Sequence, residues 1–344
     1  MIARTPFGFT AEGGPVHRYS MRDEHGCGAD FLDYGCIIQS LFVRDRLGAI
    51  RDVCLGYDTV EGYEQNGDYM GAVLGRCANR IAGAKFVLDG RTHCLSANDG
   101  RHHIHGGAGG FHRRIWEAEP LSDEAIRFFR RSAQGEEGYP GNLDVSVEYA
   151  FHQNCLRIDY RAVADADTVV SLSNHTYFDL SGGMGDAMAH WLLINAERFA
   201  ENDREFIPTG RLLPVLGTPF DFRKGRKIAD CVDAPHEQLE RCGGLDHDFS
   251  LEGADPAALL WHEHSGIRMT VRTDMPSLEV YTANSLPGDA VGKYGRVLRR
   301  RSGICLETQH FPNAIRCDGF PSPILRKGNA YRSKTHFIFD IVEI

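Results

Sequence analysis

Several polar segments of this chain carry residue types that can move protons or bind hydroxyl groups. These segments are NRI (79–81), HGG (105–107), NHTYF (174–178), LDHDF (245–249) and ICLETQ (304–309). In the last segment, strand alternation would place Glu307 on the face of Cys305 and Gln309. A carboxylate and a histidine suit general acid–base chemistry, because modest changes of environment bring the pKa of each toward neutrality. Residue type alone does not assign these side chains to catalysis, since a strand histidine is more often a hydrogen-bonded core residue and a strand glutamate is usually solvated.

Motifs for nucleotides, metals and serine nucleophiles are missing from the sequence. There is no G-x-x-x-x-G-K-[ST] phosphate loop, no G-x-G-x-x-G after a strand and no G-x-S-x-G elbow. His236 and His262 are each followed by a glutamate but lack the second histidine of a metalloprotease helix. The histidine-rich RHHIH (101–105) offers His103 and His105 without an obvious third ligand. We therefore expect no metal and no organic cofactor.

Alternation with a period of two residues is the dominant pattern, and it indicates antiparallel β-strands. Residues 143–151 (LDVSVEYAF) alternate apolar and polar side chains, and LRIDYRA follows a polar turn at 153–154, which predicts a hairpin. Further strands are expected at 267–273, 278–282, 304–309 and 337–344. Helical signals are short, at 58–63 and 235–242, so an alternating βαβ architecture is not expected. The pattern predicts an all-β, mainly antiparallel fold with few short helices, organised as one large sandwich domain over residues 1–344.

Charge and composition argue against some classes of partner. The chain has 38 Lys and Arg against 47 Asp and Glu, a net charge of −9, whereas nucleic-acid binding needs clustered cations and anionic membrane surfaces attract basic segments. No apolar run approaches the roughly 20 residues of a membrane span, and the start MIARTPFGFT lacks the apolar stretch of a signal peptide. Ten cysteines without a C-x-x-C pair fit reduced thiols. The sequence therefore predicts a cytoplasmic protein that binds neither nucleic acid nor membranes.

Seven strings, read in order, resemble the aldose 1-epimerase family, also called the galactose mutarotases. They are GRCANRIAGAKFVLDG (75–90), NDGRHHIHGGAGGFHRRIWEA (98–118), EGYPGNLDVSVEYAF (137–151), SNHTYFDLSG (173–182), GLDHDFSL (244–251), PSLEVYTANSLPG (276–288) and GICLETQHFPNAI (303–315). The resemblance implies a large β-sandwich of the galactose-mutarotase type, with the site in an open groove across one sheet. It also implies an isomerase that interconverts the α and β anomers of a free aldose of the galactose or glucose type. Only protons move when the hemiacetal opens and closes, so no cofactor is required.

The motif matches imply a role for each polar residue of these strings. Glu307 of CLETQ matches the general base, and His175 of NHTYF matches the general acid. His105 of HGG matches the histidine that positions the sugar or helps to polarise the ring oxygen. The positions that hydrogen-bond sugar hydroxyls are matched by Asn79, Arg80 and Asp246.

One departure from the family pattern falls beside these motifs. Glu279 in LEVYT stands where most members carry glutamine. Strand alternation puts Glu279 on the face of Tyr281, toward the groove, which makes it a further candidate for substrate binding. A second acid near Glu307 is expected to raise the pKa of the base by like-charge repulsion, or to alter the choice of sugar.

Two other functions stay open on sequence grounds. An epimerase of a phosphorylated hexose on the same fold would need cations for the phosphate, and Arg80 is the evident candidate near the matched motifs. A non-catalytic sugar-binding or regulatory protein would be more credible if Glu307 or His175 were replaced, and neither is. The sequence does not separate galactose, glucose, arabinose and xylose as substrates, and a monomer or weak dimer is the default assembly.

Overall fold

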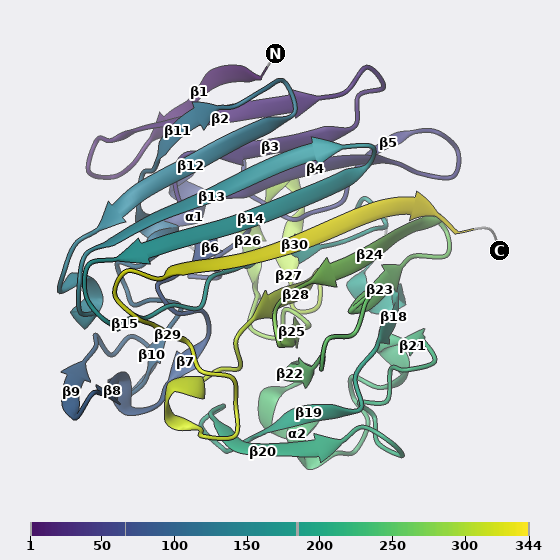
Figure 1. Cartoon of the computed structure of the whole chain (residues 1–344). Helices are drawn as coiled ribbons and strands as arrows, with labels where there is room; N and C mark the ends of the chain where they lie inside the picture. The colour runs from purple at the N-terminus through teal and green to yellow at the C-terminus, as the bar shows by residue number, and fades with distance from the viewer. Residues whose placement is uncertain (1, 66, 184–185, 343–344) are drawn as a thin grey trace.

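The computed structural model describes residues 2–65, 67–183 and 186–342, and a long sheet crosses the front of the molecule (Figure 1). This sheet has the strand order β11 (Glu117–Pro120), β12 (Ala125–Ser132), β13 (Leu143–His152), β14 (Cys155–Ala164), β30 (Ala330–Ile341), β24 (Ile267–Thr273), β23 (Ala258–Trp261), β18 (Trp191–Ile194) and β21 (Arg226–Lys227). All of its neighbouring strands are antiparallel. Because β30 lies between β14 and β24, strands from distant parts of the chain share one sheet.

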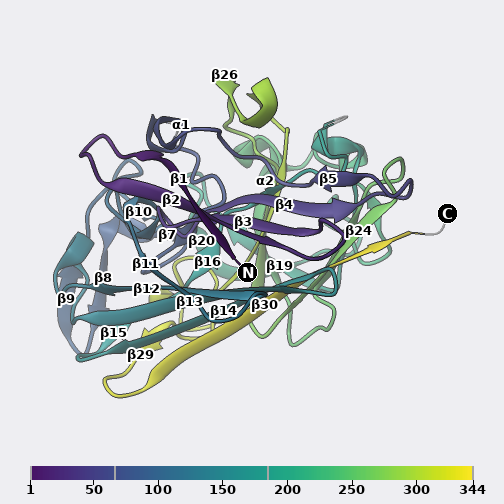
Figure 2. The same cartoon turned by 90° about the horizontal axis from the view of Figure 1, so that it is seen from above.

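Two further antiparallel sheets accompany this long sheet. The N-terminal one contains β1 (Ala3–Phe9), β2 (Pro15–Arg22), β3 (Gly28–Leu32), β4 (Ile38–Arg44) and β5 (Ile50–Asp52). The other has the order β17 (Tyr177–Phe178), β28 (Ile304–Gln309), β25 (Ser277–Tyr281), β22 (Asp246–Ser250), β19 (Arg198–Asn202) and β20 (Pro208–Pro214). Seen from above in Figure 2, the N-terminal strands form a layer over β12, β13 and β14.

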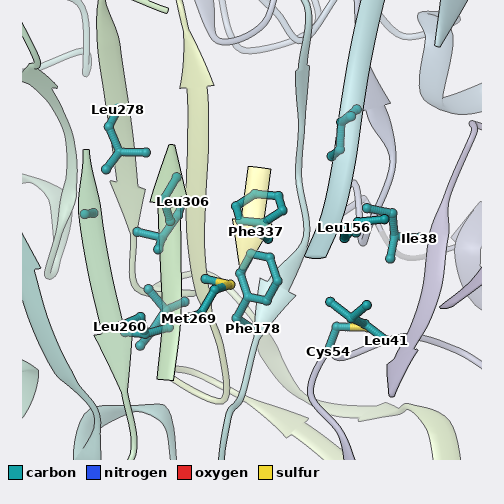
Figure 3. Packing of buried hydrophobic residues seen from close by; sticks show 14 of the residues in the cluster. Ile38, Leu41, Cys54, Leu156, Phe178, Leu260, Met269, Leu278, Leu306 and Phe337 are labelled. Atoms are coloured by element: carbon teal, nitrogen blue, oxygen red, sulfur yellow. The ribbon is translucent and has the colours of Figure 1, made fainter. Parts of the chain in front are cut away.

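The hydrophobic core lies between these layers. Phe31 of β3 stacks on Tyr149 of β13 with the ring centroids 4.5 Å apart, which joins the N-terminal sheet to the long sheet. In Figure 3, Leu306 of β28 and Phe337 of β30 belong to the same buried cluster, which joins the third sheet to the long sheet. Burying this apolar surface is the main force that holds the layers together.

Short elements complete the fold around the sheets. The two-stranded pairs are β6 (Val73–Leu74) with β16 (Ser173–Asn174), β7 (Arg80–Ile81) with β10 (His103–Ile104), β8 (Lys85–Leu88) with β9 (Arg91–Cys94), β15 (Thr168–Val169) with β29 (Ile324–Leu325), and β26 (Pro287–Val291) with β27 (Val297–Arg299). The α-helices among the described residues are α1 (Val60–Gln65) and α2 (Glu237–Cys242). Neither is long or apolar enough to cross a lipid bilayer.

The strands and helices that the sequence predicted form at or close to their expected positions. The hairpin is confirmed as β13 and β14, and its turn residues Gln153 and Asn154 have φ values of 49° and 58°. The strands expected at 267–273 and 304–309 are β24 and β28, and the one expected at 278–282 is β25, which begins and ends one residue earlier. The strand expected over 337–344 belongs to the longer β30, and residues 343–344 lie outside the described residues. Both short helices form within the segments expected for them or just beyond.

The register between β22, β25 and β28 places two rows of side chains across the third sheet. The first row is Asp246, Tyr281 and Cys305, with Tyr177 of β17 beside Cys305, and the second row is Asp248, Glu279 and Glu307. The residues that alternate with these rows along the strands, such as Leu278, Val280 and Leu306, belong to the core cluster. Because side chains alternate along a strand, the two rows project to the opposite face of the sheet from the core.

Candidate active site

A cavity of about 240 Å³ lies over the first of these rows. It is lined by six of the seven predicted site residues, namely Asn79, Arg80, His105, His175, Asp246 and Glu307. Its other described lining residues are Gly67, Asp68, Tyr69, Ile104, Tyr177, Phe206, Cys242, Tyr281, Asn284 and Ser285. The fold therefore brings together side chains that are up to 228 positions apart in the sequence, from Asn79 to Glu307.

Glu307 is a buried carboxyl group at the base of the cavity. Its residue is 2% exposed, and its Oε2 atom is buried without a hydrogen-bond partner among the described residues. Burial raises the pKa of Glu307 well above its ordinary value of 4.5, and the charges of Asp246 and Asp248 raise it further, whereas Arg80 lowers it. The side chain thus holds its proton to higher pH than an exposed glutamate does.

His175 lies in the connection between β16 and β17 and faces Glu307. Its backbone N–H donates to the carbonyl oxygen of Ala72 at 2.9 Å, which fixes the connection. Its Nε2 atom is 3.5 Å from Oε1 of Glu307, and its Nδ1 atom is 3.5 Å from Sγ of Cys305. Burial lowers the pKa of His175 to about 4, which favours a neutral imidazole.

His105 and Asn79 hold each other through reciprocal contacts between β7 and β10. The backbone N–H of Asn79 donates to Nδ1 of His105 at 3.1 Å, and the backbone N–H of His105 donates to the carbonyl oxygen of Asn79 at 3.1 Å. Burial and the nearby His175 and Arg80 lower the pKa of His105 well below 6.5. Because Nδ1 accepts a hydrogen bond in the neutral ring, the proton is on Nε2, which can donate to a ligand.

Arg80 provides the cation of the cavity, and carboxylates orient it. Its Nε atom donates to Oδ2 of Asp99 at 2.7 Å, and its Nη1 atom is 3.9 Å from Oδ2 of Asp246. The guanidinium carbon lies 5.3 Å from the centre of the Phe206 ring. A guanidinium beside a carboxylate can contact neighbouring hydroxyl groups with several hydrogen bonds, which suits the binding of a sugar.

Glu279 lies behind Asn79 and is not among the described residues that line the cavity. Its Oε2 atom accepts a hydrogen bond from Nδ2 of Asn79 at 3.1 Å, and Glu279 stands opposite Asp248 in the register of β22 and β25. Burial raises the pKa of Glu279 well above 4.5, with the charges of Asp248 and Asp246 adding to it. This environment favours the neutral acid form of Glu279.

This arrangement changes the expected effect of Glu279 on the base. We predicted that Glu279 would raise the pKa of Glu307 as a second negative charge. The pKa of Glu307 is indeed raised, but by burial first and then by Asp246 and Asp248. A neutral Glu279 contributes little charge, and it acts on the cavity through its hydrogen bond to Asn79.

Comparisons with known proteins agree with this geometry. The family model of aldose 1-epimerase matches residues 17–337. Galactose mutarotase from Sus scrofa is 39% identical over 99% of both chains, and aldose 1-epimerase from Haemophilus influenzae is 35% identical over 98% of this chain and 100% of its own. The crystal structure of the GalM/aldose epimerase homologue from C. elegans superposes with a TM-score of 0.88 at 30% identity, covering 94% of this chain and 98% of the other.

The chain belongs to the aldose 1-epimerase family. The predicted antiparallel β-sandwich and the predicted isomerase class are thereby confirmed. Members of this family interconvert the anomers of aldoses, and this activity is assigned to the present chain.

Some lining residues of this epimerase were not singled out from the sequence. Tyr69 lies in a loop with a left-handed φ of 56°, and its ring centroid is 4.5 Å from that of His105. Phe206 also lies in a loop, with φ 61°. Neither follows a strand pattern, so alternation gave no signal for them. Asn284 and Ser285 lie within the matched string 276–288, which could have indicated them.

The histidine-rich segment 101–105 separates into structural and cavity residues. The ring of His103 contacts the carbonyl oxygen of Ser96 and the hydroxyl of Tyr139, each at 2.7 Å. Both ring nitrogens of His103 are therefore engaged, as expected for a core histidine. Of the three histidines in this segment, only His105 is among the described residues that line the cavity.

Proposed function

We propose that this epimerase uses Glu307 as general base and His175 as general acid on a free aldose of the galactose or glucose type. The observation that carries the proposal is the 3.5 Å separation between Oε1 of Glu307 and Nε2 of His175 at the base of a polar cavity. A carboxyl group and an imidazole at this separation can reach the two oxygens bonded to one anomeric carbon. Those are the two oxygens at which mutarotation requires proton transfer.

The reaction proceeds by two proton transfers that are later reversed. Glu307 takes the proton from the anomeric hydroxyl while His175 gives a proton to the ring oxygen, and the C1–O5 bond breaks. The aldehyde then turns about the C1–C2 bond. Ring closure returns the proton from the new hydroxyl to His175 and the proton on Glu307 to the carbonyl oxygen, which yields the other anomer.

The electrostatics of the cavity favour the state reached after ring opening. Burial raises the pKa of Glu307 and lowers that of His175 to about 4, which stabilises the neutral acid and the neutral imidazole. That is the pair present beside the open-chain aldehyde. Before each turnover, transfer of one proton over the short distance from Glu307 to His175 creates the charged pair that attacks the ring. A cavity complementary to the unstable open chain lowers the barrier to opening.

The remaining polar residues are proposed to position the sugar. Nε2–H of His105 can donate to an oxygen of the ring, and Arg80 together with Asp246 can contact neighbouring hydroxyls. Asn79 donates through Nδ2 to Glu279, so its side chain is held in one orientation. Fixed partners of this kind place the anomeric carbon between acid and base.

The two alternative functions are less well supported by the lining. A phosphorylated hexose carries a dianion, but Asp68, Asp246 and Glu307 line the cavity and Arg80 is already paired with carboxylates. A non-catalytic binding protein would not need an acid and a base in contact at the cavity floor. We therefore favour a free aldose as the substrate.

We also propose a single domain, a cytoplasmic location, and a monomer or weak dimer without nucleic-acid partners. The place of β30 between β14 and β24 supports one domain, because its removal would divide the long sheet. All ten cysteines are free, which supports a reducing compartment. The net charge of −9 supports the absence of nucleic-acid binding.

Polarimetry of freshly dissolved α-anomers tests the proposal. The protein should accelerate the approach to anomeric equilibrium for galactose or glucose, and comparison with arabinose and xylose ranks the substrates. The α-anomer of glucose 6-phosphate serves as the test of the phosphorylated alternative. Loss of the acceleration in both Glu307→Gln and His175→Asn is expected, whereas acceleration of the phosphorylated sugar alone would overturn the assignment.

A further inference from the structure

Three different metal-ligand types meet on the floor of the active site. One imidazole nitrogen of His175, the Sγ atom of Cys305 and a carboxylate oxygen of Glu307 all lie within 4.8 Å of one another. All three residues are buried, at 5%, 0% and 2% exposure. Cys305 and Glu307 project from the same face of β28, and His175 reaches them from the connection before β17.

We propose that Cys305, His175 and Glu307 form a binding site for Zn²⁺, and that the cation competes with the sugar. The inference rests on the proposed function for its inhibitory effect, because the cation would occupy both the base and the acid. It does not make Zn²⁺ a cofactor of the epimerase reaction.

The set of ligands matches the preferences of zinc. Thiolate, imidazole and carboxylate are the common zinc ligands, with bonds of about 2.0–2.3 Å, and three protein ligands with one open position is the usual arrangement at accessible zinc sites. Those bond lengths place neighbouring ligand atoms about 3.3–3.6 Å apart in a tetrahedron. The Nδ1 atom of His175 is 3.5 Å from Sγ of Cys305, and its Nε2 atom is 3.5 Å from Oε1 of Glu307. A site that uses one of these nitrogens has its three ligand atoms within 4.8 Å of one another, so rotation of the imidazole and a closer approach of the ligands would complete the tetrahedron.

Charge balance also favours a divalent cation here. A thiolate and a carboxylate together cancel the charge of Zn²⁺, so the occupied site would be neutral, and an isolated charge at this depth would be costly. The Oε2 atom of Glu307 has no hydrogen-bond partner among the described residues, so its carboxyl group has unused capacity to bind. Binding replaces the thiol proton of Cys305, and any proton on Glu307, with the cation, and the protons leave to solvent.

The fourth position of the tetrahedron would face the cavity. Glu307 and His175 both line the cavity that the sugar is proposed to fill. A sugar bound here exchanges protons with Glu307 and His175, and a Zn²⁺ ion bound to both residues would block that exchange. Zn²⁺ and aldose should therefore weaken each other's binding by the same factor.

The test measures metal binding directly, without relying on activity. The 344-residue chain is titrated with Zn²⁺ in competition with a chromophoric chelator, and with Co²⁺ to record the near-ultraviolet charge-transfer band of a cobalt–thiolate bond. We expect one tight site per chain, a thiolate band, and a lower apparent Zn²⁺ affinity in saturating galactose. Polarimetry should show inhibition by Zn²⁺, reversal by EDTA and no inhibition by Mg²⁺, because Mg²⁺ prefers oxygen ligands.

Matched cysteine variants assign the site. Cys305→Ser should weaken Zn²⁺ binding at least about tenfold, since loss of even an outer partner of a metal ligand costs about 10–100-fold in affinity, and it should abolish the cobalt–thiolate band. Cys305→Ala provides a second variant in case the serine chain does not fold. Cys155→Ser, at a partly exposed position at the start of β14 in the long sheet, should leave the Zn²⁺ affinity and the cobalt–thiolate band unchanged.

The outcomes separate this inference from the proposed function. A Co²⁺ complex without a thiolate band, or Zn²⁺ binding that survives in both Cys305 variants, would overturn the site. Tight Zn²⁺ binding that galactose does not weaken would contradict the proposed competition between the cation and the sugar. A protein that binds Zn²⁺ through Cys305 but never accelerates mutarotation would instead contradict the proposed function.

Discussion

Replacing Glu307 by glutamine should separate catalysis from stability, because the two effects have opposite signs. The amide keeps the size of the side chain and can still lie about 3.5 Å from His175. It cannot take the proton of the anomeric hydroxyl at neutral pH. Loss of a general base typically lowers the rate about 10²–10⁴-fold, which is roughly 3–5 kcal/mol in activation free energy at 1.36 kcal/mol for each factor of ten.

The same substitution should not destabilise the fold at neutral pH. Because burial raises the pKa of Glu307 above 4.5, the folded chain holds this proton more tightly than the unfolded chain. Its contribution to the free energy of unfolding is therefore fully present below pH 4.5 and is lost as the pH rises toward the folded pKa. Within that window, the difference in stability between Glu307→Gln and the parent should grow by up to about 1.4 kcal/mol per pH unit in favour of the variant.

Polarimetry and urea unfolding at several pH values measure the two effects on the same samples. Glu117→Gln makes the same chemical change at an exposed position on β11 and should alter neither property. The reasoning would be refuted if Glu307→Gln retained a near-normal mutarotation rate. A stability difference that did not vary with pH would refute the raised pKa of Glu307.

Three further substitutions test the rest of the site. His175→Asn should lower kcat about 10²-fold or more with little change in KM, as steady-state polarimetry can show, because its proton is needed when the ring oxygen leaves; an effect on KM alone would make His175 a binding residue. Glu307 and His175 are active as a pair while they share one proton. That proton is lost at the pKa of Glu307, which therefore sets the upper pH limit of activity. Asp246→Asn should move this limit to lower pH, because the charge of Asp246 raises the pKa of Glu307, and an unmoved limit would contradict that coupling. Glu279→Gln should leave the limit in place, because a neutral acid is exchanged for a neutral amide that can still contact Asn79; a shift to lower pH would instead show that Glu279 is charged.

The sequence by itself determined the local structure and the chemistry of the main groups. Alternation along 143–151 predicted a strand whose apolar face is buried, since a strand with a period of two residues can cover a core on only one side. The strings around Glu307 and His175 indicated a candidate base and a candidate acid, because residue type and order along the chain suffice for a family resemblance.

Only the tertiary structure decided how those groups affect one another. The register of β22, β25 and β28 sets Glu279 between Asp248 and Glu307, and no local pattern encodes which residues of three separate strands stand opposite each other. Burial then decides which of these acids carries a proton, because the pKa of a carboxyl group depends on the solvent it loses and the charges it gains. The same proximity brings Cys305 to His175, although 130 positions separate them in the sequence. Such contacts depend on packing between distant segments, and that information is absent from any single stretch of the chain.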